Sequence, residues 1–143
     1  MNAQEPLDRA ATSMYRLVSE AALEDFTGIA IDARTRTLTL YWHGNVPKIV
    51  TDVLRQMSQT MNVRTVQAPY SFKTLDAEQR RLMRIGSDAT GPIVIMTGIL
   101  SDFSGLIVRV DRRRSATVTD AIATLLRSPV KTVIETGFPL TPL

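Results

Sequence analysis

The sequence predicts an α+β protein that contains one unit twice, each copy running helix, strand, strand, helix, strand. The clearest sign is an internal echo: residues 50–66 read VTDVLRQMSQTMNVRTV, and residues 118–133 read VTDAIATLLRSPVKTV. Two helical patterns also begin 68 residues apart, at Leu7-Asp8 and at Leu75-Asp76. Two strand-like runs lie between these signals in each half. Self-similarity at a fixed period indicates a repeated supersecondary unit.

The first helix of each half is predicted from apolar residues that recur three and four positions apart. Pro6 suits the first turn of the earlier helix, and Thr74 is the expected N-cap of the later one. The residues that define the two stripes are Leu7, Ala11, Met14, Leu17, Val18 and Ala21 in one half, and Leu75, Gln79, Leu82, Met83 and Ile85 in the other.

Two strands joined by a short turn follow in each half. They read IAID and TLTLYW in the first half, and PIVIMTG and LIVRVD in the second. Leu38, Leu40 and Trp42 alternate with polar or amphipathic neighbours, which is the period of a half-buried strand. We match FTG at 26–28 with ATG at 89–91, because glycine ends a helix or opens a strand without strain.

The echoed segments supply the second helix and the last strand of each half. Val53 and Leu54 in the first half, with Ile122 and Leu125 in the second, are predicted to face the core. The closing strands are VRTVQ and VKTVIE. Hairpins with helices on one face predict a two-layer sandwich with a mainly antiparallel sheet.

The repeat divides the chain into two predicted domains, residues 1–70 and residues 71–143, and the second domain includes an extended C-terminal tail. The expected boundary is the segment APYSFK, since Pro69 disfavours the continuation of a central strand.

Composition excludes several classes of protein. Hydrophobic residues make up 44% and charged residues 22%, a normal globular balance, and no apolar run approaches the length of a membrane span. The chain has no cysteine, so disulfides and thiolate chemistry are absent. The net charge of +3 is carried by residues 71–143, which is too modest for a dedicated nucleic-acid binder. The N-terminus lacks a signal peptide, so we expect a cytoplasmic or virion protein, or a secreted one whose signal was removed.

Residues that carry catalysis are sparse. His43 is the only histidine and stands at a strand end, where it is either a general base or a surface residue. Ser101 and Ser104 read as turn residues, and no Gly-x-Ser-x-Gly segment is present. Glycine-rich phosphate loops and metal-ligand spacings are also missing. The sequence therefore predicts no enzymatic activity, no cofactor, no metal and no small-molecule substrate.

Two segments are candidates for binding. Arg112, Arg113 and Arg114 form the one dense run of charge, which either holds an acidic or phosphate group or is a solvated loop. The tail ETGFPLTPL contains Phe138, Pro139 and Leu140, and its prolines keep it extended. It either lies in a partner's groove or packs on its own domain.

The stretch FTGIAIDARTRTLTLYWHGNVPKIVTDVLRQM, followed by VQAPYSFKTLDAEQRRL, resembles a recurring segment of secreted actinobacterial proteins that is similar to the pro-regions of the alpha-lytic protease and streptogrisin family. The resemblance covers about residues 5–85 and is carried by Phe26, Gly28, Tyr41, Trp42, Gly44 and Pro47. It implies a small non-catalytic α+β domain that assists folding of an attached protease and inhibits it, with a C-terminal tail that reaches the active site. This chain holds no protease domain, so a binding domain is what we expect.

The sequence thus predicts a protein–protein interaction module, a pro-region-like binding or inhibitory domain whose partner is another protein or a second copy. A structural assembly subunit of a phage or filament has the same lack of catalytic residues and stays open as an alternative. A small nucleic-acid-binding module is the other alternative, although the Gly-x-x-Gly loop of one such class is missing.

Overall fold

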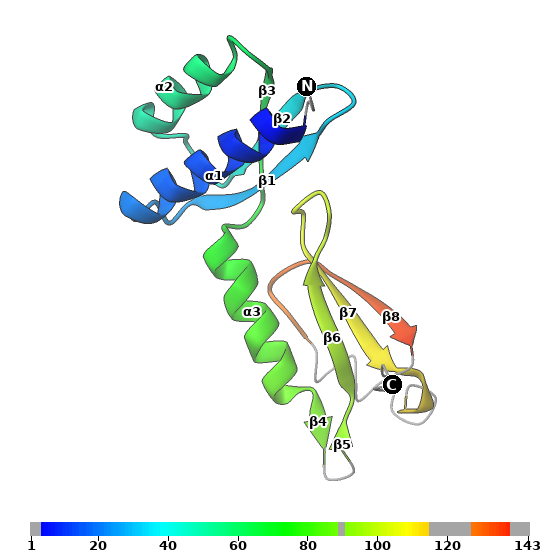
Figure 1. Cartoon of the computed structure of the whole chain (residues 1–143). Helices are drawn as coiled ribbons and strands as arrows, with labels where there is room; N and C mark the ends of the chain where they lie inside the picture. The colour runs from blue at the N-terminus through cyan, green and yellow to red at the C-terminus, as the bar shows by residue number, and fades with distance from the viewer. Residues whose placement is uncertain (1–3, 89–90, 115–126, 138–143) are drawn as a thin grey trace. The chain divides into compact units, whose positions relative to one another are not determined.

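The computed structural model describes residues 4–88, 91–114 and 127–137, and it has an α+β fold (Figure 1). The chain divides into two compact units, Met1–Lys73 and Thr74–Leu143. This division falls three residues after the boundary expected from the sequence.

The first unit contains α1 (Gln4–Glu20), β1 (Phe26–Asp32), β2 (Thr37–Trp42), α2 (Lys48–Met57) and β3 (Asn62–Gln67). Its strands form one sheet in the order β1-β2-β3. β1 and β2 pair antiparallel across a tight turn, whereas β2 and β3 are parallel. The parallel pair follows from the connection, because α2 carries the chain back along the sheet before β3 begins.

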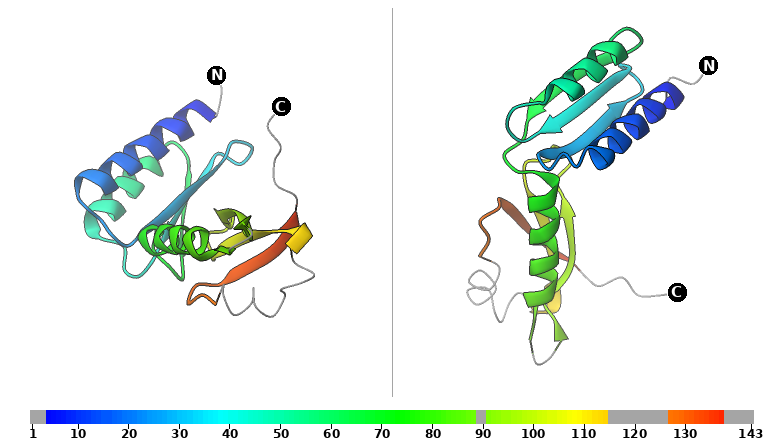
Figure 2. Two further views of the ribbon diagram at one scale, coloured as in Figure 1. Left: turned by 90° about the horizontal axis from the view of Figure 1, so that it is seen from below. Right: turned by 90° about the vertical axis from the view of Figure 1, so that its left-hand side faces the viewer.

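Both helices of the first unit cover the same face of the sheet (Figure 2, left). Leu38, Leu40 and Trp42 alternate along β2 and are fully buried on that face, which confirms the predicted alternation. The rings of Trp42 and Phe26 meet edge to face, with centroids 6.1 Å apart. The helices complete the core with Leu7, Ala10, Met14, Val50 and Leu54.

The second unit contains α3 (Phe72–Ile85), a short hairpin of β4 (Ser87–Asp88) and β5 (Gly91–Pro92), and then β6 (Val94–Ile99), β7 (Leu106–Asp111) and β8 (Thr132–Gly137). The three longer strands form a sheet in the order β6-β7-β8. β6 and β7 are antiparallel, and β7 and β8 are parallel. The hydroxyl of Thr97 donates to the Gln79 side chain at 3.3 Å, which joins β6 to α3.

The two hairpins share one register. Phe26 pairs with Trp42, Val94 pairs with Val110, and a β-bulge follows the first residue of each pair. Both members of the second pair lie 68 residues after those of the first. Strand order, strand direction and register therefore match, and the prediction that the two halves share a strand order is confirmed.

Burial repeats with the same offset. The buried positions of the first unit are Leu7, Ala10, Met14, Phe26, Leu38, Leu40 and Trp42, and the residues 68 positions later, which are also buried, are Leu75, Glu78, Leu82, Val94, Leu106, Val108 and Val110. The same backbone arrangement thus encloses two cores of different composition. One of the matched positions, Ala10 in α1, is a buried carboxylic acid, Glu78, in α3.

The sequence prediction needs four corrections. The sheets are mixed rather than mainly antiparallel, because the last strand of each is parallel to its neighbour. The helix α3 begins at Phe72, ahead of the expected cap Thr74. The two Thr-Gly pairs are not equivalent, since Gly28 lies within β1 whereas Gly91 lies in β5.

The fourth correction concerns the closing strands. β3 and β8 align with an offset of 69 residues, because Val63 lies opposite Leu38 and Thr132 lies opposite Leu106. The match between VRTV and VKTV is therefore two residues out of register. Val130 is buried ahead of β8 instead of beginning that strand.

The predicted helical core positions had different outcomes. Leu54 is buried, which confirms that prediction, whereas Val53 is only half-buried. Ile122 and Leu125 lie outside the described residues, so their burial stays a prediction.

Replacement of Leu40 by Ala is expected to destabilise the first unit by about 2–5 kcal/mol, because the substitution leaves a cavity in a fully buried site. Denaturant unfolding followed by fluorescence of Trp42, the only tryptophan, measures this unit directly. The control Ile49→Ala removes an apolar side chain that is 49% exposed, and it is expected to cost less than about 1 kcal/mol. Equal effects of the two substitutions would contradict the assignment of the core.

Candidate functional site

The arginine run singled out by sequence follows β7, and at least two of its side chains are bound by the protein itself. Arg113 donates to the Asp111 carboxylate from Nε at 3.0 Å and from Nη2 at 2.7 Å. Arg114 donates from Nη1 to the carbonyl oxygen of Gly91 at 2.7 Å. Arg112 is exposed and also has an interaction within the protein. The run thus helps to hold β7 and β5 together, and its role in binding stays a prediction.

The Asp111 side chain is almost fully buried, so its charge needs a partner. The hydrogen bonds from Arg113 lower the pKa of the Asp111 carboxyl below its ordinary value. The acid is therefore ionised at neutral pH and serves as a structural anion. The tail residues Phe138, Pro139 and Leu140 lie outside the described residues, so the interaction-arm interpretation also stays a prediction.

The other residues considered from the sequence do not gather into a catalytic site. The Nδ1 atom of His43 lies 3.1 Å from the carbonyl oxygen of Ala68, which joins the end of β2 to the segment after β3. The Ser104 hydroxyl donates to Asp102 at 2.6 Å within the turn between β6 and β7. Both contacts are local and structural.

The outer edge of β3 is the first feature of a binding site that the structure reveals. Asn62 donates its backbone N–H to Arg36, and Ala68 donates to Trp42, both at 2.8 Å. Because backbone groups of a parallel strand point alternately to its two sides, Val63 and Thr65 turn theirs away from β2. Within the described part of the chain, no hydrogen bond is formed by these outward groups. This edge is therefore open to an added strand.

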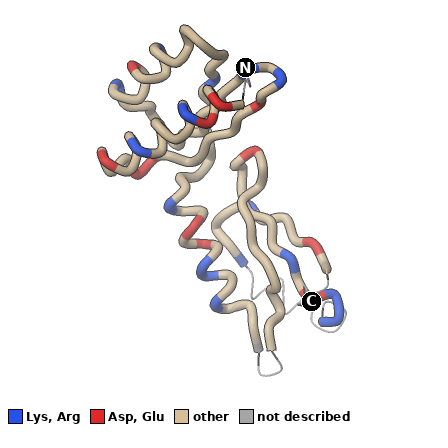
Figure 3. The backbone as a smooth tube through the Cα atoms, in the orientation of Figure 1, with Lys and Arg blue, Asp and Glu red and all other residues tan. Residues whose placement is uncertain are grey.

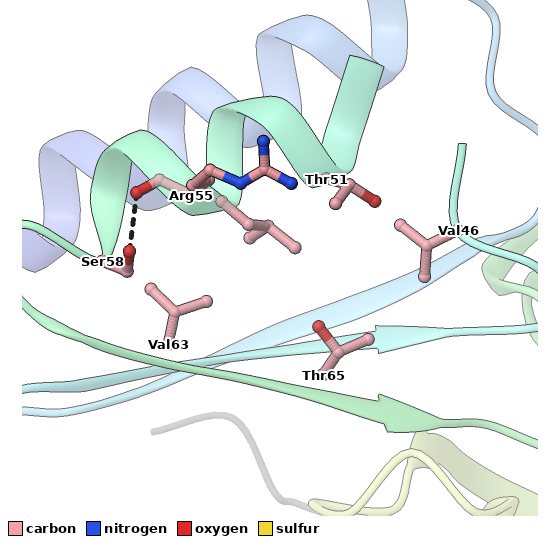
Figure 4. Close-up of a pocket in the computed structure, with 7 residues that line it drawn as sticks. Val46, Thr51, Arg55, Ser58, Val63 and Thr65 are labelled. Carbon is pink, nitrogen blue, oxygen red and sulfur yellow. Dashed lines mark hydrogen bonds between the residues drawn. The ribbon is translucent and has the colours of Figure 1, made fainter. Parts of the chain in front are cut away.

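A hollow of about 400 Å³ lies directly beside this edge, between α2 and β3 (Figure 4). Val46, Leu54 and Val63 give it an apolar floor, and Thr51, Arg55, Ser58 and Thr65 complete the lining. The residues from α2 recur at helical spacing, so one face of the helix forms one wall. We call this hollow, together with the outer edge of β3, the α2–β3 groove. Its volume lies within the range of pockets that bind ligands in other proteins.

A second hollow of about 280 Å³ shares Ser58 with the first and lies at the start of β3. Its lining is polar and includes Arg36, Gln59, Thr60, Met61 and Asn62. Arg36 donates from Nη2 to the Thr60 carbonyl at 3.3 Å, which fixes the side chain but uses only part of the guanidinium. The groove thus passes from an apolar section to a polar section that contains a cation.

Glu78 forms a separate buried cluster in the second unit. Its carboxylate accepts hydrogen bonds from the Arg81 guanidinium and from the Ser128 hydroxyl. Arg81 also donates to the carbonyl of Arg127 at 2.9 Å, and the Ser128 hydroxyl oxygen accepts from the backbone of Val130 at 3.1 Å. The cluster therefore fastens α3 to the segment that leads into β8. All its polar groups face one another, which is the arrangement of a structural tether.

Searches against protein-family models and curated proteins found no match for this chain. In the part of the chain that the structure describes, no helix is long and apolar enough to cross a membrane. Among the same described residues, no three metal-ligating side chains gather at one place. The function is therefore inferred from the geometry of the chain itself.

Sequence reasoning missed the α2–β3 groove. Val63 and Thr65 were assigned to a strand, but their position at the edge follows only from the parallel pairing of β2 with β3. The signal that was available is the connection through a helix, since strands joined by a helical crossover are parallel and not hairpin-paired. Glu78 gave a weaker signal, an acid within the apolar stripe of α3.

The Glu78 tether is expected to lose strength in acid. Burial alone would raise the pKa of Glu78, but the hydrogen bonds from Arg81 and Ser128 outweigh it and hold the pKa below its ordinary value of 4.5. A depressed folded-state pKa stabilises the fold above about pH 4.5, and this stabilisation is lost as the pH falls through the lower folded value.

The variant Glu78→Gln is therefore expected to cost about 1–3 kcal/mol at pH 7, because Arg81 loses a charged partner. The difference from the wild type is expected to shrink as the pH falls below 4.5. Denaturant unfolding followed by circular dichroism between pH 3 and pH 7 (roughly the range over which carboxyls titrate) measures both effects. A constant difference across this range would show that the charge of Glu78 is not what holds the tether.

Proposed function

We propose that this chain is a non-catalytic protein-binding module, and that the α2–β3 groove receives an extended segment of a partner protein. The observation that carries the proposal is the coincidence of an open strand edge with a hollow of about 400 Å³ along the same strand. Strand addition obtains affinity from backbone hydrogen bonds and specificity from pockets for alternate side chains. The α2–β3 groove offers both.

The geometry of β3 supports this mode of binding in detail. The outward N–H and C=O groups of Val63 and Thr65 are positioned to form a ladder with an added strand. The side chains of the same two residues line the hollow. A partner strand would therefore place every second side chain against the apolar floor while its backbone pairs with β3.

The remaining features favour binding over catalysis. The polar clusters of the described residues, around Glu78 and around Asp111, are internally paired. Neither cluster lies in the α2–β3 groove. The resemblance of about residues 5–85 to pro-regions, which bind a protease without catalysis, agrees with a pro-region-like binding or inhibitory role.

The proposal is tested by panning the full chain against a displayed library of random extended peptides and measuring the affinity of enriched peptides by fluorescence polarisation. Thr65→Pro removes one outward N–H and leaves the bonds to β2 in place, because proline is tolerated on the open side of an edge strand. It is expected to weaken these peptides at least about tenfold, a loss equivalent to about 1.4 kcal/mol. The matched control Thr65→Val keeps the N–H and is expected to bind like the wild type.

A second variant, Thr51→Trp, fills the hollow from the helix side and is expected to weaken the same peptides. It also covers the case in which Thr65→Pro lowers the stability of β3. The absence of enriched peptides, or undiminished binding by both variants, would refute the proposed function.

A further inference from the structure

We infer that the segment received by the α2–β3 groove is acidic: a short extended run of alternate apolar residues flanked by carboxylates. This inference rests on the proposed function and adds the chemistry of the partner. It is carried by the distribution of charge in the first unit, by the position of two arginines along the groove, and by a comparison with the second unit.

Charge is strongly divided within the first unit (Figure 3). Residues 4–33, which form α1 and β1, contain six acidic and two basic side chains. Residues 34–67, which form the rest of the sheet and α2, contain five basic side chains and one acidic side chain, Asp52. Because β1 and β3 are opposite edges of the sheet, one edge is acidic and the edge that carries the groove is basic. A positive surface favours the approach of a negatively charged segment.

Two arginines lie along the α2–β3 groove itself. Arg55 lines the apolar hollow, and its side chain extends along α2 toward Thr51 (Figure 4). Its contact with Asp52 is 4.0 Å long and solvent-exposed, so it holds the guanidinium only weakly. Arg36 lines the polar hollow at the start of β3. Cations therefore lie in both sections of the groove, with apolar floor between them.

The fold does not require these cations. The second unit has the same strands and register, yet its counterpart of Arg36 is Ser104, and its counterpart of Arg64 on the edge strand is Val133. The counterpart of Arg34 in the hairpin turn is Asp102. A feature that one copy of a repeated fold has and the other lacks is not needed for folding. Ligand recognition is the remaining physical use for a basic edge beside an open groove.

The same arginines might suggest phosphate recognition, but the groove floor argues against a nucleic acid. Val46, Leu54 and Val63 form apolar surface at the centre of the site, where a nucleic acid would need aromatic platforms for its bases. Apolar side chains of a peptide strand fit this floor, and glutamate or aspartate at the ends of the strand matches the guanidinium groups. An acidic peptide satisfies both parts of the site.

The experiment uses the peptides enriched on the full chain and compares two double variants with equal change in net charge. Arg36→Glu with Arg55→Glu reverses the cations of the groove. Arg9→Glu with Arg16→Glu makes the same change on exposed positions of α1, away from the groove. Enriched peptides are expected to contain Asp or Glu beside the apolar run. The groove variant is expected to bind them at least about tenfold more weakly, and the α1 control within about twofold of the wild type.

Two further results are expected. Replacement of the peptide's acidic residues by Gln should reproduce the loss on the wild type, and panning on the groove variant should enrich Lys and Arg instead. Enriched peptides that depend on the Thr65 N–H but carry no acidic bias, or that bind the groove variant normally, would overturn the inference and leave the proposed function intact. Peptides that bind without dependence on Thr65 would overturn both.

Other occupants of the groove would also overturn the inference. Self-association of the chain that Thr65→Pro abolishes would assign the α2–β3 groove to a second copy. A single-stranded RNA oligonucleotide that displaces the peptides, and whose binding is lost in the groove variant, would assign it to nucleic acid. Light scattering and competition in the polarisation assay detect these two outcomes.

Discussion

The burial of a single face of β2 organises the first unit. Leu38, Leu40 and Trp42 lie on that face, and both helices are needed to cover them. Because α2 is used as a cover, it also serves as the crossover from β2 to β3, and the last pair of strands is parallel. A parallel strand added at the end of a sheet leaves its far side unpaired. The open edge of β3 and the helix wall beside it therefore both follow from the requirement to bury β2.

The second unit keeps the backbone of the first but stabilises it differently. Aromatic packing of Phe26 and Trp42 is replaced by the smaller pair Val94 and Val110. At the same time a buried position on the first helix changes from Ala10 to Glu78, whose carboxylate fastens α3 to the approach to β8. A smaller apolar core supplies less burial energy, and a charged hydrogen-bond network adds stabilisation of a different kind. The polar tether is also sensitive to pH, which an apolar core is not.

The sequence was most informative where one residue's position determines its environment. The period-two pattern of TLTLYW identifies a half-buried strand because alternate side chains of any strand face opposite sides. Matching letters were less reliable: Val130 repeats Val63 in the sequence, yet strand pairing is set by the register across β7, and Val130 is buried ahead of β8. The α2–β3 groove was not predictable for a related reason. It depends on which strand ends at the edge, and that is a property of the whole sheet.

An open edge is useful for binding only if it rejects unwanted strands. β3 carries Arg64 on its exposed surface, with Asn62 and Gln67 at its ends, and none of these favours a dry interface between copies of the same strand. In an antiparallel pair of two β3 strands, the two copies of Arg64 would lie close together and repel each other. An acidic strand meets the same arginine with attraction. The charge that discourages association of two β3 edges is therefore the charge that favours an acidic partner, so specificity and protection of the edge have one physical origin.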